Sequence, residues 1–349
     1  MFATPAKSWG RYLPGTADHD RAGCDLAGGF AGALVSVQGD LEYFASALNL
    51  PRWNVLAGGC PVCKCKRDGE CSWMFFQNWE HTAAMEWKPH EWLSWEGKSS
   101  CALFQIPSVT GCCVMLDWMH CKYLGSDMWC YGAIFWLLCH TMLVADPLAN
   151  LLQVWTEMKS FYKQLGVRHR YHYFNRLSMF QRKAGPPKLR GRAAEVQHLN
   201  KVMVCLWKKH YNPQLEVHRQ VMAWCKLNAA VENILDENKK EVAFEAAVAK
   251  EFLDSTCKMC HLHHLLMEHF QHEEPQLFNL TLKTHHLLHL AGHSHQINPR
   301  LTWNYSGEDN MGILKKLGQS CVKGLQPVDV VNKMMVHWRY GMHFQMLDA

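Results

Sequence analysis

The pair Asp117 and His120 is the feature of this chain that most directly suggests chemistry. The two residues stand at the end of an apolar run that begins at Cys113, where a core strand would carry hydrocarbon alone. Burial of an ionisable group without a partner is strongly unfavourable. We therefore expect the pair to meet a metal ion, bound nucleic acid or a hydrogen-bond network. A buried hydrogen-bonded pair without a catalytic role is the alternative.

Two more acids stand at the ends of predicted elements. Asp40 closes a second apolar run, and Glu308 opens a helical pattern after Trp303. Carboxylates from distant segments can hold Mg²⁺ or Mn²⁺, which activates an attacking oxygen and stabilises a leaving one. Simpler interpretations stay open, since Asp40 can cap a helix and Glu308 can interact with a helix dipole.

A cysteine-rich segment supplies candidate ligands of another kind. Cys60 and Cys63 form a Cys-x-x-Cys turn, and Cys65 and Cys71 follow closely. Two thiolates on such a turn can reach one tetrahedral Zn²⁺, so these four residues predict a structural zinc site, with His81 as another candidate fourth ligand. Ordinary reduced thiols and a redox pair are the alternatives.

Cys257, Cys260 and His264 would share one face of a helix and could also bind a metal. The apolar pattern of that helix continues through them, from Leu253 to Phe270. This continuity favours core thiols over a metal site.

The segment from Gln181 to Arg192 is basic and contains no acid. Such a segment is typical of a contact with a phosphate backbone, and a solvated basic loop is the alternative. Its candidate nucleic-acid contacts are Arg182, Lys183, Lys188, Arg190 and Arg192.

Composition sets the limits for these sites. With 349 residues, 48% of them hydrophobic, the chain can bury a large core in one or two domains. The first ten residues lack an apolar signal segment, so the sixteen cysteines are expected to be reduced, in the cytosol or nucleus. The net charge of +5 permits nucleic-acid binding. The uncharged stretch from Met128 to Ala145 reaches only the lower length limit for a membrane span, and we interpret it as a buried core helix.

Short strands and helices are predicted before residue 149, and mainly helices after it. The predicted elements are a loop over 1–30, a strand over 31–38, a helix over 40–50, a loop over 51–111, a strand over 112–118, helices over 149–272, a strand over 300–305 and a helix over 308–317.

The stretch Asp117-Trp-Met-His120 resembles the Asp/Cys-x-x-His signature of eukaryotic cut-and-paste transposases with an RNase H-like core, particularly the CACTA and hAT groups. The segment around Asp40, with Cys60-Pro-Val-Cys63 after it, is similar to the region of the second catalytic Asp and a small Cys insertion. The C-terminal part is similar to the end of CACTA-type transposases, where a Lys-x-His-x-x-x-His stretch precedes an aromatic strand and an acid-led helix. The matching residues there are Lys283, His285, His289, Trp303, Tyr305, Glu308, Met311, Leu314 and Lys315.

This resemblance covers roughly residues 31–347 and implies roles for the acids. Asp40 would be the second metal-binding Asp, Glu308 the final acid, and Asp117 and His120 an auxiliary pair. The implied reaction is Mg²⁺- or Mn²⁺-dependent cleavage and transfer of DNA strands.

The first catalytic Asp of such a core is expected to be absent. Asp18, Asp20 and Asp25 lie in a Gly/Ala-rich context rather than in an apolar strand. The chain would then be a truncated or decayed copy, whose activity by itself is doubtful because a metal ligand is lost.

The predicted fold class is α/β with a large all-α insertion, that is, a partial RNase H-like core in a helix-rich chain. The resemblance implies a nuclear, DNA-binding protein without a membrane span, for which a homo-oligomer is allowed. The alternatives are an inactive transposon-derived DNA- or protein-binding remnant, and a hydrolase that uses Asp117 and His120 with an unidentified nucleophile. The predicted domains are a loop-like segment (1–30), the first part of the core (31–148) with a zinc-knuckle insertion at about 58–82, a helical insertion (149–275) and the last part of the core (276–349).

Overall fold

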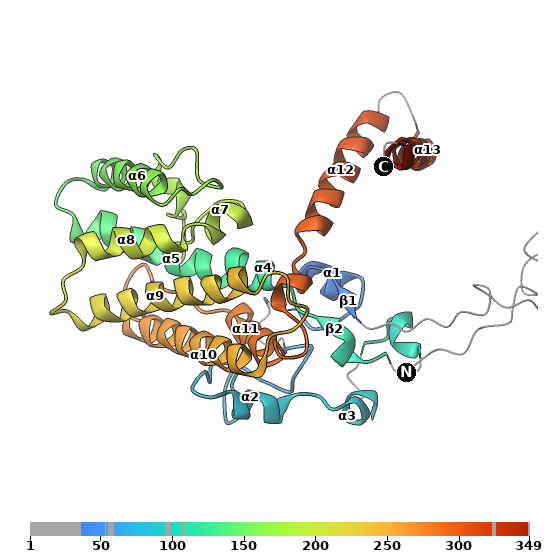
Figure 1. The fold of residues 1–349 in the computed structure, drawn as a ribbon, viewed down its shortest axis with the longest axis horizontal. Coiled ribbons are helices and arrows are strands. Elements are labelled where there is room, and N and C mark those ends of the chain that lie inside the picture. Colours follow the sequence, from blue (N-terminus) through green and yellow to red (C-terminus); the bar gives the residue numbers. More distant parts are fainter. Residues whose placement is uncertain are drawn as a thin grey trace, which may run out of the picture.

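The computed structural model is helix-rich, with two short strands among the residues that it describes. In Figure 1 most helices stack side by side in one body, and the last two helices extend away from it. The predicted loop over 1–30 and most of the predicted strand over 31–38 lie outside the described residues. The structure describes residues 36–52, 54, 59–94, 99–106, 109–322 and 326–347.

Short elements make up the chain before the first long helices. They are β1 (Val37–Gln38), α1 (Leu41–Ser46), α2 (Trp79–Met85), α3 (Pro89–Ser94), the 3₁₀ turns η4 (Ala102–Gln105) and η5 (Gly111–Cys113), β2 (Val114–Met115) and α4 (Trp118–Cys121). β1 and β2 pair in parallel, with Val37 opposite Val114. Asp40 follows β1 and caps α1, and Asp117 follows β2 and caps α4. Because the carboxyl ends of parallel strands meet at one edge of a sheet, both aspartates lie at the same edge.

Two predictions about this part were wrong in detail. The predicted strand over 112–118 shortens to β2, since the Asp117 side chain accepts a hydrogen bond from Met119 N and starts a helix. The predicted loop over 51–111 contains α2 and α3. α2 starts where the Asn78 side-chain oxygen accepts a hydrogen bond from His81 N at 3.0 Å. The predicted helix after Asp40 is confirmed as α1.

A nearly continuous buried helix runs through the core from α4 to Met142, and we call it the central rod. It consists of α4, the π-helical turn η6 (Lys122–Ser126), α5 (Asp127–Trp136) and the π-helical turn η7 (Leu137–Met142). Gly125 departs from helical geometry, with φ −122° and ψ −106°. The rod contains most of the stretch that we interpreted as a core helix, and that part is largely buried. None of the described helices has both the length and the apolar character that a membrane crossing requires.

A long helical block follows the central rod, as predicted. It contains α6 (Pro147–Gln164), η8 (Leu177–Met179), α7 (Ala193–Gln197), α8 (Asn200–His210), α9 (Glu216–Glu237) and α10 (Ala246–His269). α6 begins where Asp146 caps the helix and Pro147 occupies its first turn. α9 and α10 lie side by side (Figure 1).

A buried ionic network fixes the central rod to α9. The Lys122 ammonium is completely buried and lies 2.7 Å from Asp127, 3.0 Å from Glu232 and 2.9 Å from the Asn228 side-chain oxygen. Burial lowers the pKa of Lys122, but the charges of Asp127 and Glu232 outweigh burial and raise that pKa overall. Since each ion has a partner, removal of any one of them would leave an uncompensated charge between the two helices.

The last elements are α11 (Leu282–Gly292), the 3₁₀ turn η9 (Pro299–Thr302), α12 (Tyr305–Cys321) and α13 (Pro327–Leu347). Every residue of α11 is buried. The predicted strand over 300–305 was wrong. The Asn298 side-chain oxygen accepts a hydrogen bond from Arg300 N at 3.0 Å, and a 3₁₀ turn forms there. The predicted helix at Glu308 is confirmed, and it begins three residues earlier, at Tyr305. α12 starts beside α4 and then leaves the body (Figure 1), so Glu308, in its first turn, remains near Asp117.

Candidate metal centres

Asp117 anchors the first candidate centre, which also contains Asp40, His120 and Glu308 and which we call the acidic centre. Asp117 Oδ1 accepts hydrogen bonds from Met119 N at 2.8 Å and from Asn304 N at 3.3 Å. Its Oδ2 lies 2.5 Å from His120 Nδ1. A carboxylate held in this way fixes the orientation of the imidazole beside it.

Glu308 lies at the other side of His120. Its Oε1 is 3.2 Å from His120 Nε2, and its side chain is 45% exposed. Burial raises the pKa of Glu308, the charges of Asp117 and Asp40 raise it further, and His120 lowers it. The charges of Asp117 and Asp40 therefore act on Glu308. Among the described residues, however, these three acids do not belong to a group whose ligand atoms all lie within 4.8 Å of one another.

Asp40, a member of the acidic centre, also caps a helix. Its side chain caps α1 by accepting a hydrogen bond from Tyr43 N at 2.5 Å, as the simpler interpretation of this residue expects. Its charge also acts on Lys283, whose pKa is lowered first by burial. The cap uses Oδ1, and Oδ2 remains available for a ligand.

The geometry argues against the hydrolase alternative. In a nucleophile–His–acid triad, the second imidazole nitrogen faces a hydroxyl or a thiol. Here His120 Nε2 faces the carboxylate of Glu308. Asp18, Asp20 and Asp25 lie outside the described residues, so the prediction that the first catalytic Asp is absent stays a prediction.

The second candidate centre joins two cysteines of the Cys-rich segment with two histidines of α11. Cys60, Cys63, His285 and His289 are buried, and their ligand atoms all lie within 4.8 Å of one another. We call these four residues the Cys/His cluster. Cys63 Sγ is 3.2 Å from His285 Nε2, which is 3.0 Å from His289 Nε2. Such a set, with two residues from a Cys-x-x-Cys turn and two on successive helical turns, could hold a Zn²⁺ ion in tetrahedral coordination.

Protonation in this cluster also fits a metal. Burial lowers the pKa of His289 to about 4, so the imidazole is neutral near pH 7, the state that ligates a metal. His289 Nδ1 donates to Glu86 at 2.7 Å, which directs the Nε2 lone pair toward His285. The two Nε2 atoms are 3.0 Å apart, so a proton or a cation must lie between them.

Glu86 forms the outer edge of the cluster. It also accepts a hydrogen bond from His293 Nε2 at 2.8 Å, and Glu86, His289 and His293 form a second possible ligand group. Burial raises the pKa of Glu86, but the hydrogen bonds from the two histidines lower it overall to about 2. The carboxylate is therefore ionised and can hold His289 in its ligating tautomer.

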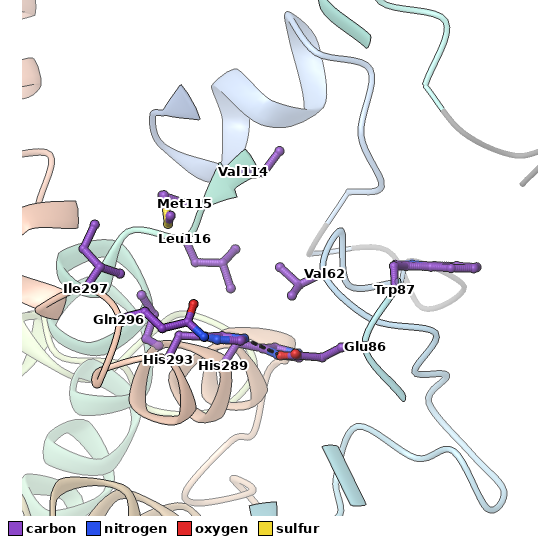
Figure 2. Close-up of a pocket in the computed structure, with 11 residues that line it drawn as sticks. Val62, Glu86, Trp87, Val114, Met115, Leu116, His289, His293, Gln296 and Ile297 are labelled. Carbon is purple, nitrogen blue, oxygen red and sulfur yellow. Dashed lines mark hydrogen bonds and ion pairs between the residues drawn. The ribbon is translucent and has the colours of Figure 1, made fainter. Parts of the chain in front are cut away.

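A cavity of about 390 Å³ lies beside this edge (Figure 2). Val114 and Leu116 line one part of it, and Glu86, His289 and His293 line another. His293 is 34% exposed, so this edge is the part of the centre nearest to solvent.

The predicted zinc ligands have different outcomes. Cys60 and Cys63 belong to the Cys/His cluster. Cys65 is buried beside it, and hydrogen bonds from Cys60 and Cys63 and then from His285 lower the pKa of this thiol. Cys71 is exposed and lies outside the cluster. His285 and His289 complete the group in place of Cys65 and Cys71.

The histidine ligands were missed because their signal is short. His285 and His289 are four residues apart, which places both on one face of α11. In the sequence, this stretch matches the transposase-like C-terminal pattern, and no local feature relates it to the cysteines. The alternative fourth ligand, His81, lies in α2 outside the cluster.

The group Cys257, Cys260 and His264 forms part of the core, as the apolar pattern indicates. Both thiols are buried on α10, and Cys260 Sγ donates to Thr284 O at 3.7 Å. Among the residues that the structure describes, these three form no metal-ligand group.

The basic segment forms an irregular connection between η8 and α7. Arg182, Lys183, Arg190 and Arg192 are exposed, and Lys188 is half-buried. Arg192 lies 3.5 Å from Glu195 across the start of α7.

The chain matches no protein-family model, no curated protein and no solved structure. The two centres must therefore be interpreted from their own geometry.

Proposed function

We propose that this chain is a transposase-like protein that cleaves and transfers DNA strands with the help of a divalent metal ion, on a partial RNase H-like core. The observation that supports the proposal is that Asp40 and Asp117 follow two paired parallel strands and that the charges of both act on Glu308. Oxygen ligands at a solvent-accessible edge suit Mg²⁺ or Mn²⁺.

Each residue of the acidic centre has a separate role in this proposal. Asp40 and Glu308 would hold the metal, which when bound polarises a phosphate oxygen and activates a nucleophilic oxygen. Asp117 uses its oxygens on backbone N–H groups and on His120, so it orients the imidazole. His120 can then hold Glu308 or donate a proton to a phosphate.

The Cys/His cluster would have a structural role. It joins the segment around Cys60 and Cys63 to α11, and the segment that follows α11 leads to Glu308. A Zn²⁺ ion there would fix the two halves of the proposed core to each other. In the same proposal, the buried thiol of Cys65 could replace one of the four ligands of the Zn²⁺ ion. Cys71 is exposed and is not proposed as a ligand.

An inactive DNA- or protein-binding remnant is the second candidate. It is favoured by one observation: both aspartates of the acidic centre already cap helices, a role that needs no metal. The two candidates differ in cleavage and not in binding, so a cleavage assay separates them.

The test is the nicking of supercoiled plasmid and of labelled duplex DNA with added Mg²⁺ or Mn²⁺. Glu308→Gln and Asp40→Asn should each lower the rate at least about 100-fold, because loss of a direct ligand exceeds the usual effect of an outer-shell change. Asp309→Asn is the matched control, since it removes an exposed acid next to Glu308. Absence of nicking that depends on Mg²⁺ or Mn²⁺, or equal rates for Glu308→Gln and Asp309→Asn, would reject the proposed nuclease in favour of the remnant.

A further inference from the structure

The basic segment is fastened to the central rod. Lys188 N donates to Phe180 O at 2.8 Å, and Leu189 N donates to Met128 O at 2.8 Å. A Cβ atom at Gly132 would lie 2.8 Å from Lys188 Cα and from Leu189 N, so the absence of a side chain permits the close approach. The segment is therefore held in one conformation, unlike a freely solvated loop.

This conformation brings two cations to one indole. The Arg182 guanidinium lies 5.7 Å from the centre of the Trp129 ring, and the Lys188 ammonium lies 5.0 Å from it. Trp129 is on α5 and is half-buried. The quadrupole of the ring attracts both cations and restricts the positions that their charged groups occupy.

These two cations repel each other. Burial lowers the pKa of Lys188, and the charge of Arg182 lowers it further. Within the described part of the chain, neither side chain makes an ion pair with a carboxylate. An anion placed between them would relieve the repulsion and accept hydrogen bonds from both.

The pair and part of the acidic centre lie along the same central rod. Asp117 caps α4 and His120 lies in it, at the start of the rod, and Trp129 lies on α5 further along it. The backbone of the basic segment is hydrogen-bonded to the rod at Met128. One rigid element therefore fixes the position of the cation pair relative to Asp117 and His120.

We propose that Arg182 and Lys188, held against Trp129, bind a phosphodiester of a DNA strand on its way to the acidic centre. This proposal rests on the proposed function, because it assigns the substrate contact of the same site. The site takes one phosphate of that strand, and Trp129 pre-organises the two cations without reading a base.

The experiment measures binding of a labelled DNA strand by fluorescence anisotropy over a range of salt concentrations, without added Mg²⁺ or Mn²⁺. The double variant Arg182→Gln/Lys188→Gln should bind at least about tenfold more weakly, because two charged hydrogen bonds are lost. The slope of log K against log salt should fall by about 0.7 to 0.9, the change expected for one phosphate contact. The matched control is Lys159→Gln/Lys163→Gln, which removes two exposed charges from α6, one of them 5.6 Å from the ring centre of Trp155.

Trp129→Leu separates the role of the ring from that of the charges. It should weaken binding but leave the salt slope unchanged, because both cations remain but are no longer held in place. Circular dichroism of each variant shows whether its fold is retained.

Three outcomes would overturn the proposal. The first is equal binding by the Arg182→Gln/Lys188→Gln variant and its control, and the second is no DNA binding by the unmodified chain. The third concerns free phosphate. Replacement of sodium chloride by sodium phosphate at equal ionic strength should weaken DNA binding by both double variants to the same extent. If it weakens binding by the control more than binding by Arg182→Gln/Lys188→Gln, the site is one for the free anion. Since no step needs Mg²⁺, loss of cleavage alone would reject the proposed function and leave this phosphate contact standing.

Discussion

The Cys/His cluster and the acidic centre each gather four residues from distant parts of the chain, but their environments differ. All four members of the cluster are less than 4% exposed, and sulfur and nitrogen are their donor atoms. In the acidic centre Asp117 is 1% exposed, whereas the side chain of Glu308 is 45% exposed, and most donors are oxygen. Buried soft donors suit a metal that holds the fold together, and accessible oxygen donors suit a metal that meets a substrate.

The two centres also depend on the fold in different ways. The cluster needs α11 to face the Cys-x-x-Cys turn, and the ion itself can supply much of the free energy that keeps them together. The acidic centre needs β1, β2, α4 and α12 in place before any metal arrives. Removal of metal is therefore expected to destabilise the region around the Cys/His cluster and to leave the elements around the acidic centre folded.

The largest expected effect is at the Cys/His cluster. Cys63→Ser should abolish zinc binding and lower the midpoint of thermal unfolding by about 10 °C or more, because a structural zinc ion contributes folding free energy directly. The measurements are the zinc content per chain and a thermal melt. Cys71→Ser is the control, since this thiol is exposed, and it should leave both quantities unchanged. Equal loss of zinc from the two variants would instead support the ligand set predicted from the sequence.

A second large effect is expected in the central rod, which carries Asp117 and His120 at its start. Lys122→Met should lower the free energy of unfolding by about 3–5 kcal/mol, because Asp127 and Glu232 would remain buried without their cation. Urea denaturation measures this change. Lys209→Met breaks a pair with Glu157 in which the lysine side chain is 51% exposed, and should cost less than about 1 kcal/mol. Similar values for the two variants would contradict a special role for the buried network.

The smallest effect concerns the pH dependence of the acidic centre. The pKa of Glu308 is raised in the folded chain, so its ionised form destabilises the fold, and stability is lost as the pH rises from the ordinary carboxyl range through the raised pKa. Glu308→Gln should therefore be more stable than the unmodified chain at neutral pH without a divalent metal. Because the side chain is 45% exposed, solvent screening keeps the gain below about 1 kcal/mol. The gain should disappear at pH values below the ordinary carboxyl pKa.

Added Mg²⁺ sharpens this last prediction. It should raise the unfolding midpoint of the unmodified chain and of Asp309→Asn, but not that of Glu308→Gln, because only a bound ion stabilises the folded state. Stabilisation of all three proteins to the same extent would show that the acidic centre does not hold the ion, and the contrast between the two regions would then be lost.

The sequence predicted local features well where neighbours along the chain decide them. Asp40 and Asp117 were identified as residues at the ends of apolar runs, and both follow strands and cap helices. The helix at Glu308 and the helical block after residue 149 follow from apolar periodicity. The strand over 300–305 failed because one asparagine cap and a proline outweigh the preference of a few aromatic residues.

The partners of the cysteines could not be predicted in the same way. Cys65 and Cys71 are the nearest thiols in sequence, and proximity in sequence was the only available guide. The folded chain instead brings α11 against Cys60 and Cys63, because every residue of that helix is buried in the core. No local pattern encodes which buried helix face meets which turn.

By itself the sequence determined which side chains can ionise or bind metals, and which of them stand at the ends of strands and helices. Only the tertiary structure decided that the charges of Asp40 and Asp117 act on Glu308, and that His285 and His289 join Cys60 and Cys63. The physical reason is that capping and periodicity act over a few residues, whereas the meeting of distant groups depends on how the whole core packs.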